Sequence, residues 1–432
     1  MEPSTSDSSS SLLSAAGWKQ RLVFWSGAVL VGLFISTLTL LSEKAVAEVR
    51  LFARQYPREF FFLCPLGLAV TVWLTERWFP GARASGVPQV KAALAISHDL
   101  KLRRRFVSFD IAVGKVILTN LGLLSGASAG LGGPAIQIGA SIMTALGKAA
   151  RFPPHYLERG FILAGSAAGF AALFSAPLAG IIFAIEELGR SLEEKIGSLV
   201  LTAIILAGMT AFVILNHYVF LGARQVILPP GRGWLAIPVC GIVGGLAGGI
   251  FSYLLLRLGR RIGGVTGRRR LVWVLGLGLA IAWLGSVSQG LTLGTGYPML
   301  VQIVTDTAPI SVWYPLQKAA ATLATALSGV PAGLFVPSLS IGAALGADLH
   351  LWFPLAPFST MVLLTMCAYF SGMLQTPMTA FVLVMEMTDT HELLLPLMAS
   401  AFIATGAAKL FNPKPLYDTL TEPYVRDLRP PA

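Results

Sequence analysis

Long apolar segments, separated by short polar or basic stretches, follow one another along almost the whole chain of 432 residues. A helix needs about 20 mostly apolar residues to cross the hydrocarbon core of a bilayer. The apolar segments that approach or reach this length are residues 22–42, 59–76, 107–128, 160–173, 196–216, 235–256, 271–289, 313–327, 357–372 and 393–411. This pattern predicts an all-α polytopic membrane protein.

One apolar segment, residues 88–98, contains only 11 residues and is too short to cross a bilayer. Arg77 and Arg83 precede it, and the basic run Lys101–Arg105 follows it. Basic residues at both ends favour a half-span that enters and leaves the membrane from the cytoplasmic side. A second short segment lies at residues 297–305.

The composition agrees with a membrane protein, since 55% of the residues are hydrophobic and only 12% are charged. Soluble domains carry about a quarter of charged residues. The long apolar segments also differ from the alternating strands of about 10 residues in outer-membrane barrels. The cysteines show no metal-binding spacing, and we expect no metal, no cofactor and no enzymatic activity.

The net charge of +11 does not indicate a nucleic-acid partner, because the basic residues lie in loops between the apolar segments. The main groups are Lys101–Arg105, Arg257–Arg261 and Arg268–Arg270. Cytoplasmic loops carry such an excess of lysine and arginine. We therefore expect the N-terminus to be cytoplasmic, in a multi-pass protein of the plasma (inner) membrane.

Two copies of one motif stand about 200 residues apart, at residues 129–140 and 332–343, and both fit A-G-L-x-x-P-x-x-x-I-G-A. Proline is favoured in the first turn of a helix, and glycine lets the backbone approach a ligand or neighbour closely. Each copy therefore predicts an irregular segment that becomes a helix. Helix N-termini carry unpaired N–H groups and partial positive charge, so two facing each other would form an anion site.

A second match between the two halves of the sequence supports an internal repeat. Pro177 lies nine residues before Glu186, and Pro377 lies nine residues before Glu386. Repeats that contain broken helices are typical of transport folds. We therefore divide the chain into a polar tail (1–20), a first transmembrane repeat (21–216), a linker loop (217–233), a second transmembrane repeat (234–411) and a C-terminal segment (412–432).

The motifs resemble the three signature loops of the CLC family of chloride channels and chloride/proton antiporters. The matching residues are Ser85–Pro88, Gly130–Pro134 and Gly333–Pro337, and residues 174–187 and Pro415–Tyr417 match as well. The resemblance implies an inverted-repeat fold of about 18 tilted, broken and re-entrant helices. It also implies a homodimer in membrane lipid with one chloride pore in each subunit.

The resemblance also implies which residues bind chloride. By their matching positions, the hydroxyl groups of Ser85 and Tyr417 and the backbone N–H groups of Leu334 and Phe335 would form a central site. Backbone N–H groups around Gly132, Gly133 and Val336 would line an outer site. A serine at position 85 is typical of the chloride-selective members of the family. Without the resemblance, Ser85 could simply cap a short helix, and Tyr417 could be an aromatic residue at the membrane interface.

The sequence departs from the family pattern at Gly132, where the family has a glutamate that blocks the outer site and shuttles protons. The neighbouring family arginine is Leu131, and the nearest acidic residues in the sequence are Asp110 and Glu158. Without a protonatable group, chloride movement has no evident means of driving proton transfer. The sequence therefore predicts a chloride channel or an uncoupled, passive chloride transporter.

Two alternatives stay open. Glu187 matches the inner glutamate of the antiporters, and Glu186 precedes it, so the two could form a proton pathway with a substitute for the missing carboxylate. They could instead cap the cytoplasmic mouth or pair with Arg190. A non-transporting scaffold is the other alternative, and the pore motifs in both halves argue against it.

Lys115 lies within an apolar helix, where a cation is costly. It could pair with Asp110, or it could add a positive field behind the anion path. We favour the positive field.

Overall fold

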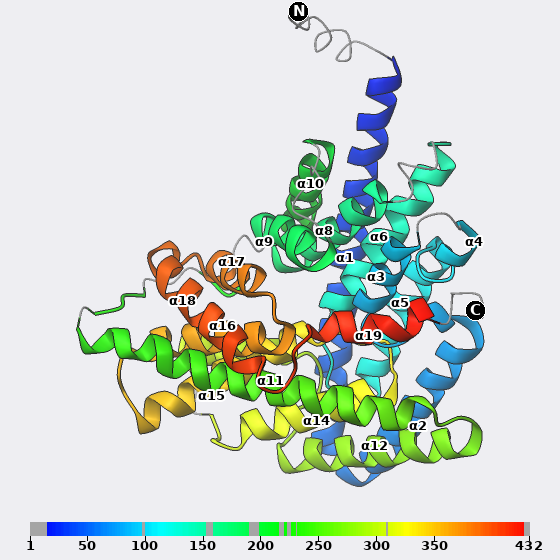
Figure 1. The fold of residues 1–432 in the computed structure, drawn as a ribbon. Coiled ribbons are helices and arrows are strands. Elements are labelled where there is room, and N and C mark those ends of the chain that lie inside the picture. The colour runs from blue at the N-terminus through cyan, green and yellow to red at the C-terminus, as the bar shows by residue number, and fades with distance from the viewer. Residues whose placement is uncertain are drawn as a thin grey trace, which may run out of the picture.

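The computed structural model describes residues 15–96, 100–152, 159–189, 198–215, 220–222, 226–229, 231–307 and 310–426. Within these ranges the chain forms 18 α-helices and a few short 3-10 or π-helical turns (Figure 1). Five of these helices are long and apolar enough to cross a membrane. The predicted all-α membrane architecture is therefore confirmed. Most of the expected polar tail, together with Glu158 and Arg190, lies outside the described residues.

The helices of the first half end near residue 215. They are α1 (Ala15–Gln55), α2 (Pro57–Trp78), α3 (Val87–Ala95), α4 (Leu100–Arg103), α5 (Phe109–Leu124), α6 (Gly132–Ala149), α8 (Gly160–Phe174), α9 (Pro177–Phe183) and α10 (Ser198–Leu215). A 3-10 turn, η1 (Pro80–Ala82), precedes α3, and a π-helical turn, η2 (Ala184–Leu188), continues α9.

The helices of the second half begin after the 3-10 turn η3 (Arg232–Leu235). They are α11 (Ala236–Gly263), α12 (Gly267–Val287), α13 (Tyr297–Thr305), α14 (Tyr314–Ser328), α15 (Phe335–Trp352), α16 (Phe358–Leu374), α17 (Pro377–Thr388), α18 (Leu394–Ala408) and α19 (Leu416–Arg426). The 3-10 turn η4 (His391–Leu393) precedes α18.

Helix α1 has 41 residues and extends well beyond the apolar run that predicted a span at 22–42. Charged residues end that run in the sequence, but most of them lie on the exposed face of the helix from residue 43 onward. The opposite face buries Ala45, Val46, Val49 and Ala53, at helical spacing. At the end of α1, Arg50 donates a hydrogen bond of 2.9 Å to the backbone carbonyl of Leu293.

The two short segments form matching half-length helices. Helix α3 begins after Gly86, which has φ +109°, and α13 begins after Gly296, which has φ +81°. Such positive φ values favour glycine. In each helix a proline occupies the first turn, where its missing N–H costs nothing. Both segments therefore form broken helices of nine residues, too short to cross a bilayer.

Two carboxylates cap helices of opposite halves in a reciprocal arrangement. Glu186 accepts hydrogen bonds from the backbone N–H groups of Met378 and Thr379 in α17, at 2.9 and 2.7 Å. Glu386 of α17 accepts two matching bonds, of 3.1 and 2.9 Å, from the first turn of α9. Helices α9 and α17 lie side by side in consequence (Figure 1). The repeated spacing from proline to glutamate thus corresponds to a mutual contact between the halves.

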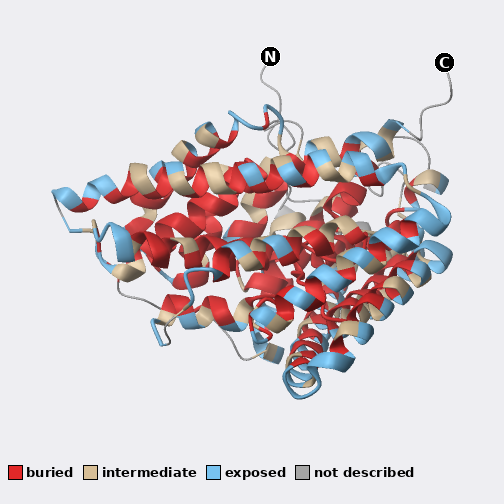
Figure 2. Ribbon diagram, turned by 90° about the horizontal axis from the view of Figure 1, so that it is seen from below, coloured by how far each residue is buried: buried red, intermediate tan, exposed pale blue. Residues whose placement is uncertain are grey.

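Small residues let the helices pack closely. Gly139 of α6 lies against Gly165 of α8, and Gly245 of α11 lies against Gly372 of α16, with backbone atoms in contact at both places. Close approach at glycine is a common way to pack membrane helices. Figure 2 shows buried residues through the interior and exposed ones on the outer helix faces. Many exposed residues are large and apolar, for example Phe62 and Val213, as expected of a surface in contact with lipid.

Candidate anion site

The two copies of the motif meet at the centre of the molecule. Gly130 and Gly333 form an isolated antiparallel bridge, in which each N–H donates to the carbonyl of the other residue at 2.7 Å. Immediately after this bridge the chain starts α6 at Gly132 and α15 at Phe335. Neither helix start has a side-chain cap. Two helix N-termini are therefore held together at the centre with partial positive charge at each.

Two hydroxyl groups lie beside these helix starts. The Oγ of Ser85 and the OH of Tyr417 are 3.4 Å apart, within hydrogen-bond distance. Both residues are buried, Ser85 with 6% and Tyr417 with 0% exposure. A Cβ added to Gly133 would collide with the Ser85 side chain and carbonyl. Ser85, Tyr417 and the start of α6 therefore face one small region.

The Ser85 hydroxyl does not cap α3. Gly86 is the N-cap residue of this helix, and the cap has no side-chain hydrogen bond. Tyr417 is fully buried in the first turn of α19, which excludes an interfacial position for its ring. Both hydroxyls are therefore available to the central region rather than to a helix end or a membrane surface.

The ring of Phe335 packs directly against Gly132. A Cβ at position 132 would overlap the Phe335 side chain near its Cδ2 and Cγ atoms. Phe335 itself is fully buried, and its ring contacts those of Phe370 and Tyr417 at centroid distances of 5.4 and 6.0 Å. The space beside residue 132 is thus filled by an aromatic ring.

Lys115 is fully buried, and its Nζ donates to the backbone carbonyls of Ala82 and Ala84 at 2.8 and 2.6 Å. The suggested pairing with Asp110 is not what the structure has, because Asp110 lies exposed in the first turn of α5. The second half repeats this arrangement. Lys318 of α14 is fully buried and donates to two carbonyls just before α13, at 2.9 and 2.8 Å. Each lysine fixes the loop that leads into a half-length helix.

Glu187 is buried with 3% exposure, and its carboxylate is 2.5 Å from the Nζ of Lys91 in α3. The same Nζ is 2.6 Å from the carboxylate of Asp418 in α19. Lys91 therefore joins the helix that follows Ser85 to the helix that carries Tyr417, and α3 and α19 run side by side (Figure 1). Glu187 is a sequence-predicted site residue, whereas Lys91 is not, because it stands within the short apolar segment that predicts only a half-span.

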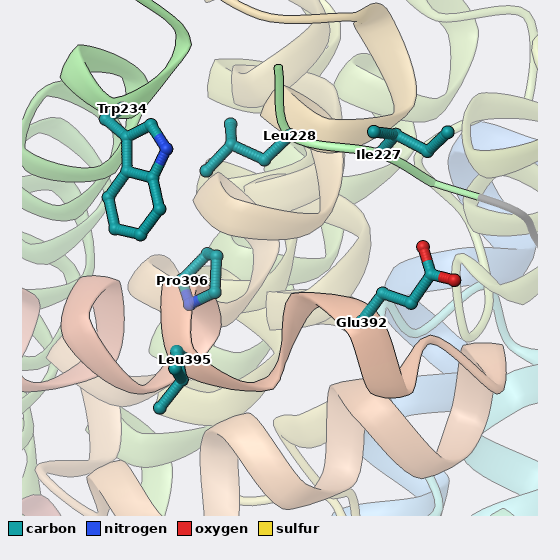
Figure 3. Close-up of a pocket in the computed structure, with 6 residues that line it drawn as sticks. All are labelled: Ile227, Leu228, Trp234, Glu392, Leu395 and Pro396. Atoms are coloured by element: carbon teal, nitrogen blue, oxygen red, sulfur yellow. The ribbon is translucent and has the colours of Figure 1, made fainter. Parts of the chain in front are cut away.

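Two cavities differ sharply in their linings. The larger has a volume of about 1430 Å³ and is bordered by α3, η2, α11 and α19, with both basic and acidic side chains on its wall. The smaller, of about 260 Å³, lies between the 226–229 segment, η3 and the start of α18. In Figure 3, Trp234, Leu395 and Pro396 line one end of the smaller cavity and Glu392 lies towards the other. Apolar residues and one carboxylate do not suit an anion, so the larger cavity is the better candidate for an entrance.

The structure brings most of the sequence-predicted site residues together. Ser85 contacts Gly133 and Tyr417, and Gly132 contacts Phe335. Leu334 is the N-cap residue of α15, and Val336 lies in its first turn. Glu186, by contrast, is engaged as the cap of α17. Lys318 could have been found from the sequence, because it follows Lys115 by 203 residues, the offset between the two motif copies.

These features define a polytopic membrane protein in which broken helices bring N–H groups and hydroxyls to one central site. The chain belongs to the voltage gated chloride channel (CLC) family, whose sequence pattern matches residues 67–409. It is therefore a CLC-type membrane protein of anion transport.

Several known proteins are similar to this chain. The H(+)/Cl(-) exchange transporter ClcA of Cronobacter sakazakii (strain ATCC BAA-894) is 28% identical over 383 residues, which cover 83% of this chain and 78% of the relative. ClcA of Klebsiella pneumoniae (strain 342) is 28% identical over 382 residues, with 84% and 78% covered.

Solved structures share the fold. A slow cyanobacterial Cl-/H+ antiporter superposes with a TM-score of 0.79 at 23% identity, over 95% of this chain and 98% of the other. A CLC-type fluoride/proton antiporter superposes with a TM-score of 0.74 at 22% identity, over 92% and 97%.

Proposed function

We propose that this protein conducts chloride passively across the membrane, as a channel or an uncoupled transporter. The observation that carries the proposal is Gly132, which has no side chain at the start of α6 and whose neighbouring space holds the Phe335 ring. A carboxylate at this position would compete with an anion for the N–H groups of the helix start. Without one, no proton carrier accompanies the anion at the outer site.

The chemistry of the site suits a weakly held monovalent anion. N–H groups at the starts of α6 and α15 and the hydroxyls of Ser85 and Tyr417 donate hydrogen bonds without a fixed cation at the ion. A conducting site must bind strongly enough to admit an ion and weakly enough to release it. Neutral donors and helix dipoles meet both conditions, and the resemblance of the Ser85 loop to that of chloride-selective CLC proteins supports chloride as the anion.

A second candidate, chloride/proton exchange, is favoured by the similar exchange transporters and by the buried Glu187. In that function Glu187 would accept protons from the large cavity, and a group other than residue 132 would carry them outward.

We further propose a homodimer with one anion path per subunit and a cytoplasmic N-terminus. The basic loops beside α4 and between α11 and α12 support that orientation.

Flux measurements on the purified protein in liposomes separate the two candidates. We expect a chloride gradient to drive chloride efflux without proton movement, and Glu187→Gln to leave that efflux nearly unchanged. Proton uptake against its own gradient, driven by chloride and abolished by Glu187→Gln, would instead establish exchange. The unmodified protein and empty liposomes serve as the two references.

A further inference from the structure

Five exposed arginines surround the turn between α11 and α12, and together they form a basic turn. They are Arg257, Arg260, Arg261, Arg268 and Arg269. Residues 196–305 contain no aspartate or glutamate. None of the five arginines forms an ion pair with another described residue. Like charges that lie close together repel each other, so the basic turn is suited to an anionic partner.

A sixth arginine beside the turn, Arg270, is already compensated. It is buried with 8% exposure, and its Nε lies 2.5 Å from the carboxylate of Glu76. This pair accounts for the charge of Arg270 but for none of the other five.

The helix dipoles explain only part of the basic turn. Arg260 and Arg261 lie in the last turn of α11, where the partial negative charge of the helix end favours cations. Arg268 and Arg269 lie in the first turn of α12, where the partial positive charge opposes them and no acidic residue is present. An anion bound among the arginines would offset both their repulsion and this unfavourable helix end.

The turn leaves room for a ligand among the arginines. Gly263, Gly264 and Gly267 each have open space where a Cβ would stand, because no more distant part of the described chain comes within 4 Å of that point. Thr266 is exposed, and its side chain does not cap α12. The backbone of the turn is therefore not covered by the rest of the described chain.

The exposed faces of both helices change from apolar to basic as they approach the turn. On α11 one exposed face holds, at helical spacing, Ile250, Leu254, Arg257 and Arg261. On α12 one exposed face holds, at helical spacing, Arg268, Val272, Leu279 and Trp283. This order matches a phospholipid, in which apolar chains adjoin a charged headgroup.

The arrangement favours a lipid over a soluble anion. Because the apolar faces contact the bilayer, the headgroups of the adjacent lipids lie at the level of the arginines. Basic pockets between membrane helices bind anionic headgroups, and the guanidinium fork matches the geometry of a phosphate. One fork is held in place, because the Nη1 of Arg257 donates a hydrogen bond of 2.9 Å to the OH of Tyr253.

We propose that the basic turn binds the headgroup of an anionic phospholipid, with the acyl chains along the exposed apolar faces of α11 and α12. The guanidinium groups hold the phosphate, and the apolar side chains hold the acyl chains. The site lies on the lipid-facing surface, apart from the proposed anion path. It therefore does not depend on which ion the protein carries.

The first test titrates the delipidated protein in neutral detergent with phosphatidylglycerol and counts the bound lipids by native mass spectrometry. Phosphatidylcholine with the same acyl chains is the reference for binding through the chains alone. The double variant Arg261→Gln/Arg268→Gln should weaken phosphatidylglycerol binding by about 10- to 30-fold, because it removes two of the charges that attract the phosphate. Phosphatidylcholine binding should stay unchanged.

The double variant Arg104→Gln/Arg105→Gln is the matched control. It removes the same charge from exposed positions in the loop after α4, where the buried Phe106 and Val107 follow instead of an exposed apolar helix face. This control should retain nearly all of the phosphatidylglycerol affinity. Equal losses in the two double variants would overturn the site, because they would reflect only the general attraction of a positive surface.

A second set of measurements tests the apolar part of the site. Leu254→Ser/Val272→Ser keeps every charge but should also weaken phosphatidylglycerol binding, and inorganic phosphate at equal ionic strength should not displace the lipid. Displacement by inorganic phosphate, or unchanged binding in this variant, would overturn the lipid as the ligand. The thermal unfolding midpoint of lipid-free Arg261→Gln/Arg268→Gln should not fall, because both side chains are exposed and Arg268 opposes the dipole of α12. This measurement separates lost lipid binding from lost folding.

Discussion

In the proposed function, residue 132 determines which groups compete for the N–H donors at the start of α6. A glutamate placed there would bring a carboxylate to the donors that the proposed anion uses, so we expect Gly132→Glu to slow chloride flux at neutral pH. Lower pH should restore part of the flux, because a protonated carboxyl competes less well than a carboxylate. The measurement is chloride efflux from liposomes across a range of outer pH.

The ring of Phe335 complicates this substitution, because any side chain at position 132 displaces it. Gly132→Gln is therefore the matched control, since it has the same size and cannot titrate. Both variants should slow chloride flux, because both displace the Phe335 ring. Only the flux of Gly132→Glu should depend on pH. A pH response of equal size in both variants would contradict an anion site beside residue 132.

The chemistry at this scale was only partly predictable from the sequence. The motif copies locate the helix starts, and the absence of a carboxylate at Gly132 is directly readable. The ring of Phe335 against Gly132 was not predictable, because it depends on how two segments 203 residues apart in the sequence pack together. The pairing of Lys91 with Glu187 was likewise not predictable, since no local pattern links residues 96 positions apart.

At the scale of single elements, the reciprocal caps of α9 and α17 are the clearest contacts between the halves. Glu186→Gln and Glu386→Gln should each destabilise the protein, by about 1–2 kcal/mol, because each removes a negative charge from two N–H groups at a helix start. The measurement is the thermal unfolding midpoint in detergent. Glu48→Gln is the control, because Glu48 is exposed in the last third of α1 and caps no helix start.

The reciprocal geometry also fixes what the double variant should do. Both caps lie in the contact between α9 and α17, so the loss of stability in the double variant should differ from the sum of the two single losses. Chloride dependence of flux should stay unchanged in all three variants. A change in proton movement caused by Glu186→Gln would contradict the capping role and would return Glu186 to a proton pathway.

The elements themselves were largely predictable, because apolar segments and prolines mark most helix starts. The main difference between the predicted and the observed helices is the length of α1. Charged residues end the apolar run in the sequence, although the helix continues. An amphipathic extension buries one face against the protein, and a count of consecutive apolar residues cannot detect that. The partner of each cap was likewise not predictable, although the nine-residue spacing from proline to glutamate was visible in both halves.

At the scale of the whole molecule, the two halves share one arrangement, in which a buried lysine holds the loop before a half-length helix. The two loops differ in the hydroxyl contacts that they make. Lys115 and Lys318 each fix the loop before a half-length helix through two carbonyl contacts. The loop before α3 carries Ser85, which contacts Tyr417, whereas the loop before α13 carries Thr295, whose hydroxyl accepts from the nearby Tyr297 N–H. The loops before α3 and α13 are therefore held in the same way, but only the loop before α3 carries a hydroxyl that belongs to the proposed anion site.

This asymmetry yields a prediction with an internal control. Lys115→Met and Lys318→Met should both lower stability, by about 2–3 kcal/mol, because each leaves buried carbonyls without a donor. Lys115→Met should in addition weaken apparent chloride affinity, since it releases the loop that positions Ser85. Lys318→Met should leave that affinity unchanged. Thermal unfolding and the chloride dependence of flux, measured on the same preparations, distinguish the two effects. Equal losses of chloride affinity in both variants would mean that the anion path depends on general rigidity rather than on the loop before α3.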